Sequence, residues 1–216
     1  DELRRRNPGL RIDSCASGGR RNDLESMRRA VPLLRSDFQF PDMKGVVEGN
    51  QGHTYGLSFW LPFQGTGCYV YDTYSFRSFY LASFGMGGLS PDNIAAQKQA
   101  YSECKKIAQL LLADYYPLTP YSLQLDRWIA WQFNRPDRGD GAIQVFRRSE
   151  CAETTMTFRL NGLNPTTRYE VTNFDLKGTI AVSGKKLMKE GLTVEIKDKP
   201  GSAVVVYRRV NHKAGN

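Results

Sequence analysis

Several features that place a sequence in a common class are absent from these 216 residues. No run of about 18 apolar residues occurs, so no membrane-spanning helix is expected. The first residues, DELRRRNPG, hold no apolar stretch of the kind found in a secretory signal peptide, although a chain that starts with Asp1 could have lost one. The sequence therefore predicts no membrane partner and leaves the compartment open.

Histidines and paired cysteines are scarce, which limits the chemistry. Of the two histidines, His212 lies in a polar tail and only His53 could serve a buried site. The sequence therefore offers a single histidine for a Ser-His-Asp or Cys-His catalytic group. The four cysteines, at positions 15, 68, 104 and 151, form no C-x-x-C pair and have no histidine at ligand spacing. We expect no metal and no cofactor, and carboxylates remain as the acid–base candidates.

The net charge of +8 is not concentrated in one stretch. The arginines between Arg4 and Arg35 are interrupted by acidic residues, and no basic run or nucleic-acid motif is present. A content of 40% hydrophobic and 24% charged residues is that of an ordinary globular protein. Nucleic-acid binding therefore rests on charge alone, and we expect no nucleic-acid partner.

Residues 1–118, the N-terminal region, show alternating strand and helix patterns typical of a parallel α/β fold. Strands are predicted at 10–16 and 31–36, with a helix between them that starts at an Asn22–Glu25 capping box. Two apolar, aromatic-rich runs that lead into glycines predict further strands at 57–63 and 76–84.

A long helix is expected to follow the fourth of these strands. Ser90 and Pro91 provide a cap and a first-turn proline, and Pro117 closes the pattern. The predicted apolar stripe of this helix comprises Ile94, Tyr101, Cys104, Ala108, Leu111 and Tyr115.

Residues 119–216, the C-terminal region, have an all-β pattern. Turn sequences such as RPDRGDG and KDKPGS separate short apolar runs, which predicts an antiparallel β-sandwich. The predicted strands are 128–134, 142–147, 154–160, 168–173, 179–182, 192–196 and 203–208. The fold class is thus α/β plus all-β. Four parallel strands do not close a barrel, so the N-terminal region is either an open sheet or part of something larger.

A candidate site lies where the first two predicted strands end. Cys15-Ala-Ser-Gly-Gly follows one strand, and Asp37 ends the next. Neighbouring parallel strands end at the same edge, so Cys15 and Asp37 should face one crevice. A buried carboxylate there can act as a general acid. The alternatives are that Asp37 caps a loop or pairs with Arg35, and that Cys15 is a small core residue.

The segment 12–38, IDSCASGGRRNDLESMRRAVPLLRSDF, resembles family 36 of the glycoside hydrolases, the α-galactosidase (melibiase) family. That family has C-x-x-G-G-x-R-x-D followed, one helix later, by S-D at a strand end. The glycine-rich stretches, the helix from Pro91 and the β-rich tail also fit the family's C-terminal layout. The matching residues of the motif are Cys15, Gly18, Gly19, Arg21, Asp23, Ser36 and Asp37.

The resemblance implies the C-terminal half of a (β/α)8 barrel in residues 1–118, followed by a C-terminal β-sandwich. It also implies retaining hydrolysis of terminal α-galactosides by two carboxylates. Asp37 would be the catalytic acid/base, which protonates the glycosidic oxygen and later deprotonates water. Asp23 is the second candidate for the acid. The substrate-binding residues implied are Cys15, Gly18, Gly19, Arg21, Asp23 and Ser36.

The nucleophile that the resemblance implies is missing. The family carries an aspartate in a K-x-D motif on the fourth barrel strand, and no such motif precedes Cys15. We therefore expect a C-terminal portion that is inactive alone and needs the N-terminal half of the barrel as its partner. A homo-oligomer remains open. A transglycosylase of the same family would share every residue named, and a non-catalytic carbohydrate-binding or structural β-module is the alternative from another class.

Aromatic residues near the middle of the N-terminal region allow two interpretations. Tyr55 and Trp60 could stack on the apolar face of a sugar, or they could pack in the core. His53 could bind a hydroxyl group or belong to a loop.

Overall fold

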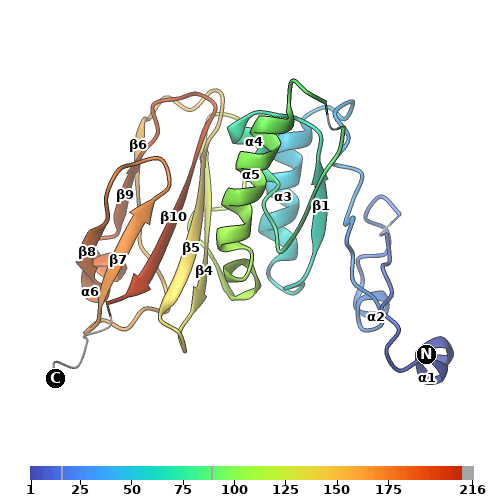
Figure 1. Ribbon diagram of the computed structural model, residues 1–216. Helices are drawn as coiled ribbons and strands as arrows, with labels where there is room; N and C mark the ends of the chain where they lie inside the picture. The colour runs from blue at the N-terminus through green and yellow to red at the C-terminus, as the bar shows by residue number, and fades with distance from the viewer. Residues whose placement is uncertain (16, 89, 211–216) are drawn as a thin grey trace.

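The computed structural model describes residues 1–15, 17–88 and 90–210. Figure 1 shows them arranged in successive layers: the N-terminal segment, coloured blue, at one side, then helices, then a large antiparallel sheet, then a small outer layer. No helix among these residues has the length and apolar character needed to cross a membrane.

The N-terminal region contains helices and two short parallel strands. These elements are α1 (Glu2–Arg6), α2 (Leu24–Met27), α3 (Val46–Leu57), β1 (Gly65–Cys68), α4 (Thr73–Ser78), β2 (Ser83–Met86), α5 (Ile94–Ile107) and the 3-10 helix η1 (Leu110–Leu112).

Four extended segments of this region run parallel to one another. A parallel bridge joins Asp13 to Val31. Residues 32–35 then meet β1 through a hydrogen bond from Gly65 N to the Pro32 oxygen (2.8 Å) and one from Arg35 N to the Gly65 oxygen (3.1 Å). Strand β1 pairs with β2 in parallel register. The order of segments is therefore 12–14, 31–35, 65–68 and 83–86, and their carboxyl ends share one edge.

The third and fourth predicted strands were placed wrongly. Residues 57–63 comprise the last residue of α3 and the turn after it, while residues 76–84 include the end of α4. The true strands are formed by GTGC and SFGM, a few residues later. Apolar periodicity cannot separate a short buried strand from a helix that packs on it. Glycine in β1 reflects crowding, since a Cβ at Gly65 would lie 2.3 Å from the Leu33 oxygen.

The predicted helix starts also need correction. Helix α2 is capped by Asp23, whose carboxylate accepts from Ser26 N (2.8 Å), and not by Asn22. Helix α5 begins at Ile94 instead of at Ser90. Its buried face is Gln97, Ala100, Cys104 and Ile107, whereas the expected stripe residues Ile94 and Tyr101 are exposed.

The C-terminal region confirms the expectation of an antiparallel β domain, and all seven predicted strands are present. An eighth strand, β3, begins at Asp114, ahead of the expected boundary at 118, and holds Tyr115. The elements are β3 (Asp114–Pro117), β4 (Trp128–Arg135), β5 (Asp140–Arg147), β6 (Thr155–Phe158), β7 (Arg168–Asn173), β8 (Ile180–Ser183), α6 (Gly184–Lys189), β9 (Leu192–Glu195) and β10 (Gly201–Arg209). Six strands form one sheet in the order β3-β4-β5-β10-β7-β8, and β6 pairs with β9.

The six-stranded sheet is buried on both faces. Along β4, Ile129, Trp131 and Phe133 face the core shared with the helices of the N-terminal region. Trp128 and Ala130 face a second core, under β6 and β9. Side chains alternate between the two faces of a strand, so those of β4 enter two different cores, and neither face of the strand is turned to solvent.

A buried arginine joins the two regions. Arg77 of α4 donates to both carboxylate oxygens of Glu103 (2.7 and 3.0 Å) and of Asp175 (2.7 and 2.6 Å), and to the Ser202 oxygen (2.9 Å). Burial alone would lower the pKa of Arg77, but the two carboxylates raise it above its usual value. The contact fixes α4 and α5 against the sheet.

Candidate functional site

The loop after the first extended segment has an unusual backbone. Cys15 and Ser17 have φ values of 41° and 45°, in the left-handed region that residues with a Cβ rarely adopt, and Gly18 and Gly19 follow at 69° and 100°. The Asp13 carboxylate accepts from Cys15 N (3.1 Å) and Leu33 N (3.0 Å), which ties this loop to the next segment. Strain of this kind persists where the surrounding structure holds a site in place.

Asp37 lies against this loop. A Cβ built on Gly18 would lie 2.9 Å from Asp37 Oδ2, so only glycine leaves room for the carboxylate at that distance. Asp37 and Cys15 are both exposed. The structure therefore brings the predicted acid next to the glycine loop, but the residues it describes do not bury the carboxylate.

Arg35 anchors the segment that carries Asp37, and it is not the ion-pair partner of Asp37. Its guanidinium is fully buried and donates to neutral acceptors: Gln64 Oε1 (2.7 Å), the Asn50 main-chain and side-chain oxygens (both 2.9 Å) and Thr54 Oγ1 (2.8 Å). Burial lowers the pKa of Arg35 to about 9. These contacts join the segment to α3 and to the residue before β1.

Ser36, an expected substrate-binding residue, makes contacts within the protein in this structure. It is buried, its hydroxyl lies 3.0 Å from His53 Nδ1, and the same oxygen accepts from Phe38 N (3.2 Å). Burial, with the charge of Arg35, lowers the pKa of His53 to about 4. The imidazole is therefore neutral above that pH, and it belongs to α3 instead of a loop.

The remaining motif residues have structural contacts. Arg21 is exposed and reaches the Ser14 oxygen at 3.5 Å. Asp23 caps α2, where its hydrogen bonds with Ser26 lower its pKa, so the second candidate acid is engaged as a helix cap. Gly19 lies close to Ser36 and the Arg35 oxygen.

Sequence reasoning missed one polar residue at this edge and left two aromatic ones open. Gln39 is buried and accepts from Gly67 N (3.0 Å), so it supports the end of β1. Tyr55 packs in the core, where its hydroxyl donates to the Thr119 oxygen (2.7 Å), as the core interpretation predicted. Trp60 is on the surface, at 39% exposed. Gln39 belongs to no motif with a characteristic spacing, so the sequence carried no signal that could have identified it.

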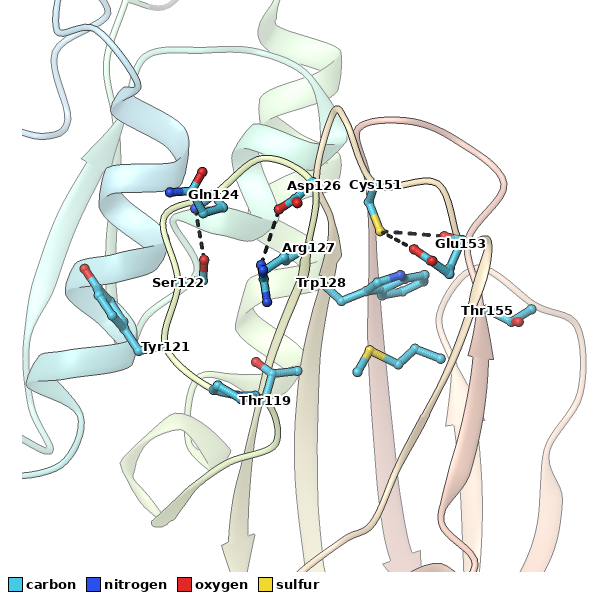
Figure 2. Close-up of a pocket in the computed structure, with 12 residues that line it drawn as sticks. Thr119, Tyr121, Ser122, Gln124, Asp126, Arg127, Trp128, Cys151, Glu153 and Thr155 are labelled. Carbon is cyan, nitrogen blue, oxygen red and sulfur yellow. Dashed lines mark hydrogen bonds and ion pairs between the residues drawn. The ribbon is translucent and has the colours of Figure 1, made fainter.

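A cleft that the sequence analysis did not predict lies in the C-terminal region. It is a cleft of about 500 Å³ between the loop before β4 and the segment that leads into β6. Figure 2 shows Asp126 and Arg127 on one side, Cys151 and Glu153 on the other, and Trp128 between them. The clustering of aromatic and polar residues in TPYSLQLDRW (119–128) is the signal that could have indicated it.

Metal chemistry finds no support in the described parts of the chain. No group of three or more histidine, cysteine, aspartate or glutamate side chains there could hold an ion.

Comparisons with known proteins show which family this chain resembles. Residues 128–207 match the model of the glycosyl hydrolase family 36 C-terminal domain. This match, with the structural matches below, is consistent with the C-terminal portion of a family 36 glycoside hydrolase. The resemblance that segment 12–38 predicted is thereby confirmed. Among curated proteins, none matches the sequence significantly.

Solved family 36 structures have the same fold. Similar structures include the galactosidase domain of the α-galactosidase–sucrose kinase AgaSK (19% identity), α-galactosidase AgaB from Geobacillus stearothermophilus (22%) and a variant of AgaA from that organism in complex with stachyose (21%), each with a TM-score of 0.74. Each match covers 97% of this chain and 30% of the other. The chain thus spans less than a third of the length of these proteins.

Proposed function

We propose that this chain is the C-terminal part of a retaining α-galactosidase that acts on α-galactoside oligosaccharides. The similar structures are named α-galactosidases, and variants of AgaA were solved with raffinose and with stachyose. In this proposal the N-terminal region is the C-terminal half of a (β/α)8 barrel, and the nucleophile lies in the preceding half.

The outer parallel segments have unpaired edges, which supports the interpretation of the N-terminal region as half of a barrel. Among the described residues, segment 12–14 pairs only with 31, and β2 pairs only with β1. Unpaired strand edges of this kind are satisfied when a barrel closes. Large exposed apolar side chains also gather in residues 1–63, as expected for a surface that another part of the protein covers. They are Leu3, Leu10, Leu24, Leu33, Leu34, Phe40, Phe59, Trp60 and Phe63.

The observation that carries the proposal is the position of Asp37 beside Gly18, at the carboxyl edge of neighbouring parallel segments. Active sites of (β/α)8 barrels lie at this edge. In the first step Asp37 gives its proton to the glycosidic oxygen as that bond breaks, while the nucleophile of the preceding half bonds to the sugar carbon. In the second step Asp37 takes a proton from the water that releases the sugar.

The test replaces Asp37 by Asn in the longer enzyme. Loss of a general acid lowers kcat/KM by about 10²- to 10⁴-fold for raffinose, whose leaving group needs protonation, and by much less for an activated aryl α-galactoside. Asp42→Asn, at an exposed position five residues along, is the matched control and should leave both rates unchanged. Equal losses on the two substrates would contradict the assignment of acid.

The 216-residue chain alone is expected to show no turnover of an aryl α-galactoside, because retaining hydrolysis needs two carboxylates. Robust turnover that Asp37→Asn abolishes would show that the second carboxylate lies within this chain.

A further inference from the structure

The cleft before β4 has walls that are fixed in advance by two consecutive buried arginines. Arg148 is fully buried and donates to the Ser122 oxygen (2.7 Å) and the Gln124 oxygen (3.0 Å) in one wall. Arg147 is 5% exposed and donates to the Cys151 oxygen (2.9 Å) and to the next carbonyl oxygen (3.1 Å) in the other. Main-chain segments held in this way form a cleft before any ligand arrives, which lowers the entropic cost of binding.

Trp128, which lines the cleft, has a hydrogen-bond donor without a partner in the part of the chain that the structure describes. Trp128 is 6% exposed, and its Nε1 is buried with no partner among the described residues. Buried indole N–H groups normally have a partner. Trp131 has such a partner, since its Nε1 donates to Gln144 Oε1 at 2.8 Å, whereas Trp128 has none within the described ranges. Trp128 thus contributes the surface of its ring to the cleft, while its N–H group lies beneath that surface without a described partner.

The lining indicates the chemistry of that ligand. Its charged side chains are Asp126, Arg127 and Glu153, two acids and one base, which gives no attraction for a phosphate or a nucleic acid. Apolar surface comes from Met156 and the rings of Tyr121 and Trp128. A neutral ring compound with an apolar face and a rim of hydroxyl groups fits both parts, since carboxylates and guanidinium groups bind hydroxyls and aromatic residues cover the apolar face.

We propose that this cleft is a second, non-catalytic sugar-binding site, which holds a neutral oligosaccharide away from Asp37. The choice of an α-galactoside as the sugar rests on the proposed function. Binding places the apolar face of a sugar ring against Trp128 and its hydroxyl groups between Arg127 and Glu153. Such a site would keep an oligosaccharide substrate on the enzyme while its terminal residue is processed elsewhere.

Indole resonances test the proposal directly in the 216-residue chain. The chain has three tryptophans, so its ¹⁵N–¹H spectrum holds three indole signals, and Trp128→Phe assigns the relevant one. Titration with stachyose should shift the Trp128 indole signal and leave that of Trp131 in place, because the latter is bonded within the core. A Trp128 signal that does not move at high stachyose concentration would overturn the proposal.

A pair of matched arginine variants sharpens the test. Arg127 and Arg138 each follow an aspartate, with side chains 65% and 67% exposed, but they lie beyond opposite ends of β4. Arg127→Ala should weaken stachyose binding about tenfold, the equivalent of ~1.4 kcal/mol, and Arg138→Ala should leave it unchanged. Equal affinities of the two variants would contradict the site.

The two proposals fail in different ways. If stachyose shifts the amides around Gly18 and Gly67 but not the Trp128 indole, the sugar binds at the Asp37 edge alone, and the second site is rejected while the proposed function stands. If Asp37→Asn in the longer enzyme has no effect on hydrolysis, the assignment of Asp37 fails, whatever the cleft binds.

Discussion

The two regions of the molecule hold their strands in different ways. In the C-terminal region, long antiparallel ladders lie between two apolar cores, and β10 pairs with β5 over 201–208 and with β7 over 205–209. In the N-terminal region, the extended segments are four residues long or reduced to a bridge, and polar side chains such as Asp13, Arg35 and Gln39 hold them together. Both faces of the C-terminal sheet are covered, one of them by helices of the N-terminal region, whereas the N-terminal region leaves strand edges and apolar surface open.

The largest expected effect comes from removing a core ring of the sheet. Trp131 is fully buried, and Trp131→Ala should lower the free energy of unfolding by about 3–5 kcal/mol. The matched variant Trp60→Ala, at a 39% exposed position of the N-terminal region, should cost less than about 1 kcal/mol. Denaturant unfolding of both variants checks this. Equal losses would show that the N-terminal region is as well packed as the sheet.

Acid should weaken the N-terminal region through His53. Its pKa is lowered from 6.5 to about 4 in the folded protein, so the unfolded chain binds the proton more readily. The stability from this group is complete above pH 6.5 and is lost as the pH falls towards 4, by up to about 1.4 kcal/mol per pH unit.

The variant His53→Gln isolates that contribution, because glutamine cannot titrate. Between pH 6.5 and 5 its unfolding free energy should fall less than that of the unaltered chain, by about 1–2 kcal/mol. Parallel curves for the two proteins over this range would mean that His53 keeps its ordinary pKa.

A smaller effect separates backbone strain from contact with Asp37. Gly18 and Gly45 have nearly the same φ, 69° and 67°, but a Cβ at Gly45 meets nothing within 4 Å. Each Gly→Ala variant should therefore lose about 1 kcal/mol of stability from strain. Only Gly18→Ala should move the Asp37 side-chain resonance. An Asp37 signal that is unchanged in Gly18→Ala would contradict the contact.

The smallest effect is a difference in labelling. Cys15 is exposed, and Cys68, Cys104 and Cys151 are buried. Burial raises the pKa of the Cys68 and Cys104 thiols to about 12. A thiol reagent at pH 8 should therefore modify one cysteine per folded chain quickly, and Cys15→Ser should abolish that fast phase. Two fast thiols would show that one of the cores opens readily.

The difference between the regions also explains what could be predicted from the sequence. Antiparallel strands between turn-rich segments such as RPDRGDG keep a local signal, so all seven predicted strands of the C-terminal region are found. In the N-terminal region, the aromatic runs at 57–63 and 76–84 pack helices, while the strands they cover are GTGC and SFGM. Strands this short depend on neighbours distant in sequence, and no local pattern identifies them.

The candidate site was predictable in outline. The motif placed Asp37 and the glycine loop together, and the geometry agrees. The contacts of Ser36 with His53 and of Arg35 with Asn50 were not predictable, because they join side chains that a whole helix brings into reach. The cleft at Trp128 was missed for a similar reason, since its walls come from two segments more than 20 residues apart.

The most direct test of the account is azide rescue of the Asp37→Asn variant in the longer enzyme with an aryl α-galactoside. If Asp37 is the acid/base, azide replaces water in the second step, enters from the same face and restores turnover with an α-configured galactosyl azide as product. A β-configured product would identify Asp37 as the nucleophile. That result, or the absence of any rescue, would contradict the central claim that Asp37 donates the proton to the departing sugar oxygen.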